Sequence, residues 1–348
     1  MKKQIIIFIL CALCCALLAA YSAPALAAAR EGFYLWRDDV LPALLPFFVC
    51  AYIMQNCGVL HSRNRLCLYG LSMVSGAPAG ARLAGSQEVD HTDTVAALNA
   101  VSPMFICGSF AAGMLGQPAL AWPILLAQLL SAGVFLLLAR DPGGPDAPAP
   151  IKKPKPFLAL MSDAIASGIG AMLNIGGAIM CFMALMALMA QTGAMAAFTA
   201  PLSALCQRAG LSPALPQVLF TGMLEMVAGC EELALARLSL RQTAAFGAFF
   251  FSFGGICILA QSLAFARLRA GRYLIRKLLQ GGLAALLAYL LAPIFLPDAQ
   301  AVFSPLPADV LAQNALSAAF TAGISLVCVS VLLLLAAGIG GIRNRANR

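Results

Sequence analysis

The chain has 348 residues, of which 61% are hydrophobic and only 10% are charged, and its mean hydropathy is +0.89. An ordinary soluble domain carries about a quarter charged residues, so lipid rather than water is expected to be the main solvent. The net charge of +8 does not indicate a nucleic-acid-binding protein. Its Lys and Arg residues fall in short segments between apolar stretches, which is how the orientation of a membrane protein is encoded.

The apolar stretches predict an all-α polytopic membrane protein. A helix needs about 20 mostly apolar residues to cross a hydrocarbon core of about 30 Å, whereas the strands of a membrane barrel alternate over about ten residues. The apolar runs here fit the helical pattern. Most of the twelve cysteines lie inside apolar runs without ligand spacing, and there are only two histidines, so no metal centre or other cofactor is expected.

The first segment, residues 1–30, is either a first transmembrane helix or a signal-like segment. Lys2 and Lys3 precede an apolar run at 5–20, and the small residues at 25–27 resemble a cleavage site. On both interpretations the chain leaves the inside here, so the later topology is the same.

About eight transmembrane helices are predicted from the apolar runs and from the Lys and Arg residues between them. In chain order the predicted spans are residues 5–20, 41–60, 95–115, 119–138, 171–190, 243–264, 278–296 and 320–342. With these spans every basic segment lies inside. The sequence therefore predicts a multi-pass protein of the cell membrane, the inner membrane, with both termini cytoplasmic.

A Pro-rich linker with three lysines, residues 140–156, divides the chain into two halves. We expect a first repeat at 31–139, a second repeat at 157–264, and a basic loop with two C-terminal transmembrane helices at 265–348. The basic residues of that loop are Arg267, Arg269, Arg272, Arg276 and Lys277. Such a cluster is expected on the inside of the membrane.

Two stretches do not fit as ordinary spans. Residues 66–93 are rich in Gly, Pro and Ser, and residues 215–242 carry Glu225 within an apolar run. Each must enter and leave on the same side if the basic segments stay inside, so we predict two opposed re-entrant hairpins. A span with a polar interruption follows each one, near Asn99 and near Ser252. Inverted repeats with broken segments in matching positions indicate a transporter site near the midplane.

Broken helices give a physical reason for binding. Where a helix stops inside a membrane, its last carbonyls or first amides lack partners, and a solute can supply them. Half-helix N-termini favour anionic groups, and an ionisable group such as Glu225 is costly enough there to suggest proton coupling or solute contact. The predicted solute-binding residues are Ser75, Gly76, Arg82, Asn99, Ser102, Thr221, Gly222, Glu225 and Ser252.

Several of these residues also have a structural interpretation. Arg82 is either a counter-charge for the solute or a positive-inside anchor, and Glu225 is either functional or a hairpin-tip residue that meets solvent. Asn99 and Ser102 could bond the solute or merely another helix. The sequence alone leaves these alternatives open.

Four short runs carry a family resemblance: residues 44–48, 75–82, 99–105, and 221–225 with Gly229 and Cys230. These runs resemble the YlbJ-type sporulation integral membrane proteins, whose fold is the Gate or nucleoside-recognition domain. The resemblance covers about residues 32–264, and its most specific part is the Gly-Ala-Pro-Ala-Gly stretch at 76–80. It departs in the short central linker and in the first break of the second half, where Asn174, Gly176 and Gly177 are the only polar or flexible marks.

The resemblance implies a relative of concentrative nucleoside transporters in an endospore-forming bacterium. It further implies delivery of dipicolinate, a small planar dianion, to the developing spore, although a nucleoside or another carboxylate remains open. The expected partners are a small-molecule solute and the lipid bilayer, with H+ or Na+ as a possible coupling ion and a homo-oligomer as a possible assembly.

Two other classes of function are alternatives to transport. No His-Glu-x-x-His pair or nucleophile with a base is present, so an enzyme is not expected. A non-transporting sporulation membrane scaffold is the stronger alternative. It should tolerate single replacements of Arg82, Asn99 and Glu225, whereas a transporter should lose solute accumulation.

Overall fold

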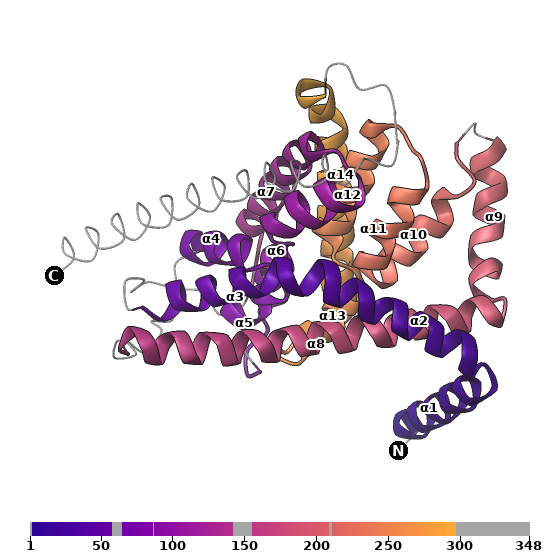
Figure 1. The fold of residues 1–348 in the computed structure, drawn as a ribbon, viewed down its shortest axis with the longest axis horizontal. Helices are drawn as coiled ribbons and strands as arrows, with labels where there is room; N and C mark the ends of the chain where they lie inside the picture. Colours follow the sequence, from indigo (N-terminus) through magenta and orange to yellow (C-terminus); the bar gives the residue numbers. More distant parts are fainter. Residues whose placement is uncertain (1, 58–64, 86, 142–154, 209–210, 297–348) are drawn as a thin grey trace.

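The computed structural model describes residues 2–57, 65–85, 87–141, 155–208 and 211–296, and every regular element in these ranges is a helix (Figure 1). The predicted all-α class is confirmed. Five stretches of helix are long and apolar enough to cross a membrane: Ser22–Asn56, Pro118–Leu137, Phe157–Gln191, Leu240–Leu263 and Ala270–Phe295. The predicted span 320–342 and most of the predicted linker 140–156 lie outside the described residues.

The N-terminal region is more helical than predicted. Helix α1 (Lys2–Ala20) comes first. Helix α2 (Ser22–Leu35), the π-helical turn η1 (Trp36–Val40) and α3 (Leu41–Asn56) follow it and form one continuous helical stretch, Ser22–Asn56. The helix therefore starts well before the predicted span 41–60, and α2 includes residue 30, where the first segment was expected to end. In the turn η1, Arg37 pairs with Asp38 at the surface (2.6 Å) and the Ser109 hydroxyl donates to the carbonyl of Asp39 (2.9 Å).

Helix α8 (Phe157–Gln191) lies antiparallel along this stretch, as the lower part of Figure 1 shows. Gly32 lies beside Met183, and Gly168 lies beside Leu45. The helix contains the predicted span 171–190 and starts 14 residues before it. A helix of 35 residues is about 52 Å long, longer than a hydrocarbon core, so its first turns can carry polar residues such as the exposed Asp163.

The first half continues with short, interrupted helices: α4 (Arg65–Ser75), α5 (Ala79–Ala84), α6 (Thr92–Leu98), the π-helix η2 (Phe105–Met114), the 3-10 turn η3 (Pro118–Leu120) and α7 (Ala121–Leu137). The turn between α4 and α5 contains Gly76, whose φ of +74° suits glycine. A Cβ added to Gly76 would lie 3.0 Å from Ser102. The α4–α5 turn thus rests on the gap between α6 and η2.

The second half has the same arrangement. After α9 (Ala194–Arg208), which the sequence did not predict, come α10 (Leu215–Leu224), α11 (Met226–Leu235), α12 (Leu240–Phe253) and α13 (Gly255–Leu263). Glu225 is extended between α10 and α11. Gly254, with φ +83°, separates α12 from α13. A Cβ added to Gly255, the first residue of α13, would lie 3.1 Å from the carbonyl of Leu224. Here too, the turn of a short helix pair rests on the gap in the next helix.

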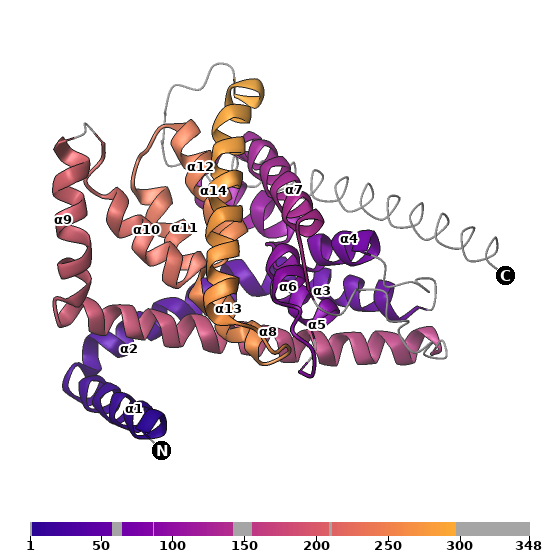
Figure 2. The ribbon, with the colours of Figure 1, turned by 180° about the vertical axis from the view of Figure 1, so that it is seen from behind.

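Helix α14 (Ala270–Phe295) packs against both α12 and α7, as the back view shows (Figure 2). The predicted loop before it is too long, because Arg272, Arg276 and Lys277 lie within the helix. The short connection 264–269 makes α14 antiparallel to α12–α13, with Gly281 beside Phe249.

The bases of the two short helix pairs lie at opposite ends of α14. Gly85, at the end of α5, packs on Ala266 just before α14 begins. The end of α11 leads directly into α12, whose start lies toward the end of α14. The turns of both pairs point into the same core, where Phe105 and Phe110 of the first half pack edge-to-face on Phe251 of the second, with ring centroids 6.0 and 5.0 Å away.

Candidate functional site at the helix breaks

A cavity lies where the helix breaks of the two halves meet. The breaks contribute Gly76, Ala77, Val101, Ser102, Glu225, Met226 and Val227, and the remaining lining residues are Val40, Leu44, Phe105, Ile175, Ile179, Ile258 and Gln261. The cavity therefore draws on both halves of the chain.

The lining is mostly apolar, with three polar side chains on it: Ser102, Glu225 and Gln261. The Glu225 side chain is 3% exposed and its Oε2 accepts a hydrogen bond from the amide of Ala228 (2.8 Å), so it caps the start of α11. Ser102 caps η2 in a similar way, since its hydroxyl accepts from the amide of Phe105 at 3.3 Å. Among the described residues, the lining includes no Lys or Arg. The one ionisable group of the lining is thus a carboxyl.

The main chain at the gap between α6 and η2 is bonded largely by the protein itself. Gln128 of α7 accepts from the amide of Val101 (3.2 Å) and donates to its carbonyl (2.8 Å), as a neighbouring strand would. Lys277 Nζ donates to the carbonyl of Asn99 (2.6 Å). Gln280 Nε2 lies 3.5 Å from the carbonyl of Ala97. These side chains contact main-chain carbonyls and an amide for which the sequence analysis expected the solute to be the hydrogen-bond partner.

Asn99 holds four helices together rather than lining the cavity. Its Nδ2 donates to the Ser262 hydroxyl (2.8 Å) and to the Tyr273 hydroxyl (3.0 Å), while its Oδ1 accepts from the amide of Ala81 (3.1 Å). The side chain is 1% exposed. Its amide therefore links α5, α6, α13 and α14.

Arg82 also lies away from the cavity lining. Its guanidinium stands over the ring of Phe265, 4.5 Å from the centroid, and within 6.0 Å of the Phe48 ring. Cation–π contact of this kind stabilises a partly buried arginine in place of a carboxylate. The structure thus places Arg82 in an aromatic setting.

The other predicted residues surround the breaks without lining the cavity. Ser75 donates to the carbonyl of Leu71 (2.7 Å), and Thr221 donates to Glu232 (3.0 Å). Gly222 lies where α10 crosses α11, and Ser252 is fully buried in α12 with no partner among the described residues. Of the nine predicted residues, Gly76, Ser102 and Glu225 are the ones that line the cavity.

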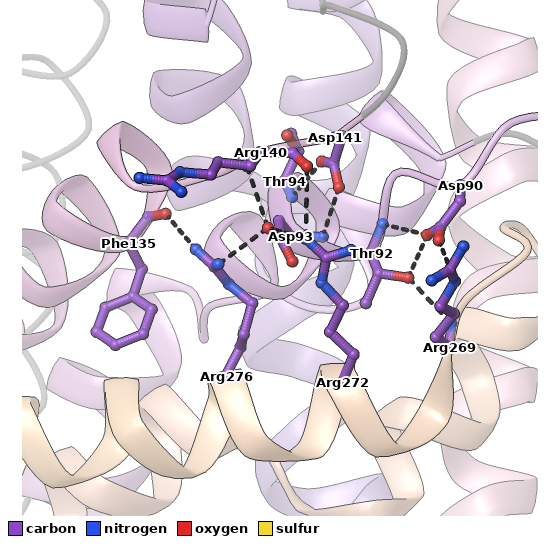
Figure 3. A network of polar contacts seen from close by, with 10 residues as sticks. All are labelled: Asp90, Thr92, Asp93, Thr94, Phe135, Arg140, Asp141, Arg269, Arg272 and Arg276. Carbon is purple, nitrogen blue, oxygen red and sulfur yellow. Dashed lines mark hydrogen bonds and ion pairs between the residues drawn. The ribbon is translucent and has the colours of Figure 1, made fainter.

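A cluster of charged residues that the sequence analysis missed lies at the start of α6 (Figure 3). Asp93 is fully buried and its Oδ2 binds Arg272 (2.6 Å) and Arg276 (2.9 Å), both on α14. The same oxygen accepts from the amide of Arg140 (3.1 Å). Asp141 accepts from the amides of Asp93 (2.9 Å) and Thr94 (2.7 Å) and so caps α6. The cluster ties α6 and the end of α7 to α14.

Asp90 extends this cluster in the loop before α6. It forms an ion pair with Arg269 (2.7 Å) and accepts hydrogen bonds from the hydroxyl and amide of Thr92. Burial alone would raise the pKa of Asp90, but the hydrogen bonds from Thr92 and the charge of Arg269 outweigh it, so the pKa is below its ordinary value. Acidic residues in a polar loop gave no sequence signal of this pairing, because their partners lie about 180 residues away.

The fold defines a polytopic helical membrane protein with interrupted helices around a shared cavity. Its sequence is similar to the sporulation integral membrane protein YlbJ of Bacillus subtilis (strain 168), with 25% identity over 315 residues that cover 76% of each chain. This similarity supports the resemblance to the YlbJ-type proteins. No protein-family model and no solved structure matches the chain.

Proposed function

We propose that this protein carries a small solute across a membrane through the cavity between the helix breaks, as part of sporulation. The observation that carries the proposal is that the breaks of both halves, at Gly76, at Ser102 and at Glu225, line one cavity. Interrupted helices in matching positions of two halves are typical of transporters, whose binding sites lie at the interface of the repeats.

In this proposal the pairs α4–α5 and α10–α11 are re-entrant hairpins of an inverted repeat. Their bases lie at opposite ends of α14, and their turns lie at the cavity. Each hairpin would then separate the cavity from one side of the membrane. Small movements of one half against the other would open the site to either side in turn.

Dipicolinate is the first cargo to test, since the resemblance to YlbJ-type proteins implies it. A dianion would meet the carboxyl of Glu225 in a mostly apolar cavity, and two like charges are strongly unfavourable there. Glu225 would therefore carry a proton when the anion is bound. We infer that the anionic cargo crosses together with H+ rather than by itself.

Uptake by membrane vesicles that contain the full chain tests the proposal. We expect labelled dipicolinate to accumulate more than uridine, and to do so only with an inward proton gradient. Glu225→Gln should abolish the response to the gradient, whereas Glu231→Gln, on the same helix but outside the lining, should retain it at equal membrane abundance.

One result would contradict transport itself, and two others would contradict the proton carrier or the cargo. Equal uptake by vesicles with and without the protein would remove transport and favour the scaffold alternative. Normal gradient-driven uptake by Glu225→Gln would leave transport intact but exclude Glu225 as the proton carrier. Greater accumulation of uridine than of dipicolinate would identify a nucleoside as the cargo, without contradicting the proposed path.

A further inference from the structure

Lys277 is a buried lysine that has no role in the proposed transport path. Its side chain is 0% exposed in α14, and Nζ donates to the main-chain carbonyl of Asn99 at 2.6 Å and lies 3.5 Å from Gln280 Oε1. In the described part of the chain it forms no ion pair with a carboxylate. The nearby Asp93 is already bound by Arg272 and Arg276.

Hydrogen bonding alone does not explain an ammonium at this position. Neutral amides contact the neighbouring carbonyls. Gln280 Nε2 lies 3.5 Å from the carbonyl of Ala97, and Gln128 Nε2 donates to the carbonyl of Val101 (2.8 Å). A glutamine could serve the Asn99 carbonyl equally well. A buried ammonium without a counter-ion is costly, so a lysine at this position calls for a reason of its own.

The carbonyl of Asn99 supplies that reason. Asn99 directly follows α6 and its backbone is not helical (φ −76°, ψ 86°), so its carbonyl belongs to the unwound segment between α6 and η2. In transporters with broken helices, unwound main-chain carbonyls and the C-terminal ends of half-helices coordinate the coupling cation. Val101 and Ser102, which line the cavity, follow Asn99 directly.

We propose that the Lys277 ammonium is a tethered cation that occupies the unwound carbonyl after α6, so that the cavity is organised without a bound alkali-metal ion. The expectation that cargo uptake does not need Na+ rests on the proposed function. The position of the Lys277 ammonium at the Asn99 carbonyl does not, because it is a property of the folded protein itself. Its consequence is that Na+ has no specific site at this break while Lys277 is present.

Thermal unfolding of the purified full chain in detergent tests this without any cargo. The chain is compared in NaCl, KCl, methylammonium chloride and choline chloride at equal ionic strength and pH. We expect the wild type to melt at the same temperature, within about 1 °C, in all four salts. Lys277→Met, which keeps the bulk but not the charge, should melt several degrees lower in every salt, and Lys277→Arg should recover part of that loss.

Lys277→Ala opens space at the Asn99 carbonyl. We expect it to melt lower than the wild type and to be stabilised by Na+ or methylammonium relative to the bulky choline cation. The absence of any such rescue counts against a cation site. If Lys277→Ala does not fold, the wild-type salt series and the Met and Arg variants still decide.

A wild type that melts several degrees higher in NaCl than in choline chloride would overturn the inference. So would a Lys277→Met variant as stable as the wild type, since the charge would then have no role. In vesicles that accumulate cargo, replacing Na+ by choline should leave uptake unchanged. Vesicles that accumulate nothing would contradict the proposed function while the melting data still decide the role of Lys277.

Discussion

At the scale of single residues, the polar side chains of this protein mostly serve to hold its interrupted helices in place. Gln128 pairs with the main chain of Val101, Asn99 links four helices, and Asp93 binds two arginines of α14. Each of these side chains is buried, where an unsatisfied polar group costs about 1–3 kcal/mol. Among the residues that the structure describes, Glu225, Ser102 and Gln261 are the ones that present polar side chains to the cavity.

The Asp93 cluster gives a prediction at this scale. Asp93→Asn leaves Arg272 and Arg276 without a carboxylate, and breaking a buried ion pair costs about 3–5 kcal/mol. Because Arg272 is 35% exposed and partly screened by solvent, we expect a loss near the lower end of that range. The measurement is the melting temperature in detergent, which should fall by several degrees.

Asp163→Asn is the matched control, because it removes the same charge from a pair with Lys155 at the surface. Exposed pairs contribute little to stability, so this variant should melt like the wild type. Equal melting temperatures for Asp93→Asn and the wild type would mean that the cluster does not hold α6 against α14.

At the scale of elements, close packing of small residues allows the helix pair α10–α11 to double back. The pair α10–α11 crosses at Gly222 and Gly229, and a methyl group added to Gly229 would overlap the Cα of Gly222. A methyl group on Gly222 would meet the Phe250 ring. Small residues at such crossings are common in membrane helices, because they let backbones approach closely.

Gly229→Ala should therefore force α10 and α11 apart. Overpacking typically costs about 1–3 kcal/mol, so we expect a lower melting temperature and, in vesicles, weaker uptake. Gly282→Ala serves as the control, since nothing lies within 4 Å of a Cβ built on that glycine of α14. It should melt at the same temperature or slightly higher, as alanine favours a helix. Tolerance of Gly229→Ala would contradict the tight crossing.

At the scale of the whole molecule, the two halves share one arrangement: a long helix, a short helix pair whose turn rests on the next break, and a final unbroken helix. The long helices 22–56 and α8 lie antiparallel, and α14 joins the halves by binding α6 and α7 of the first and packing on α12 of the second. Contacts between halves, rather than within them, enclose the cavity.

The proposed inverted repeat predicts that the bases of the two short helix pairs face opposite sides of the membrane. An epitope tag inserted after Gln87 should be reached by antibody only in inside-out vesicles, because that loop lies beside the basic residues around Arg269. A tag inserted after Ala236 should be reached only in right-side-out vesicles. Accessibility of both tags from one side would exclude an inverted repeat.

Hydropathy and the spacing of glycine and proline determined much of this protein from the sequence alone. They gave the helical membrane class and located the breaks near Gly76, Asn99 and Glu225, because an interrupted apolar run is a local feature. They failed at the helix starts near residues 22, 157 and 270, where charged residues suggested loops. Charged residues at the surface, such as Arg37 and Asp38, are compatible with a helix. Arg272 and Arg276 bind Asp93, which lies far outside any hydropathy window.

Only the tertiary structure decided which of the predicted polar residues meet at the cavity. Asn99 and Arg82 looked like Ser102 and Glu225 in the sequence, yet the first is bonded among four helices and the second lies over Phe265. The partners Asp93 with Arg276, and Asn99 with Lys277, are separated by about 180 residues. Such pairings depend on how the two halves pack against each other, and no local pattern of residues encodes that distance.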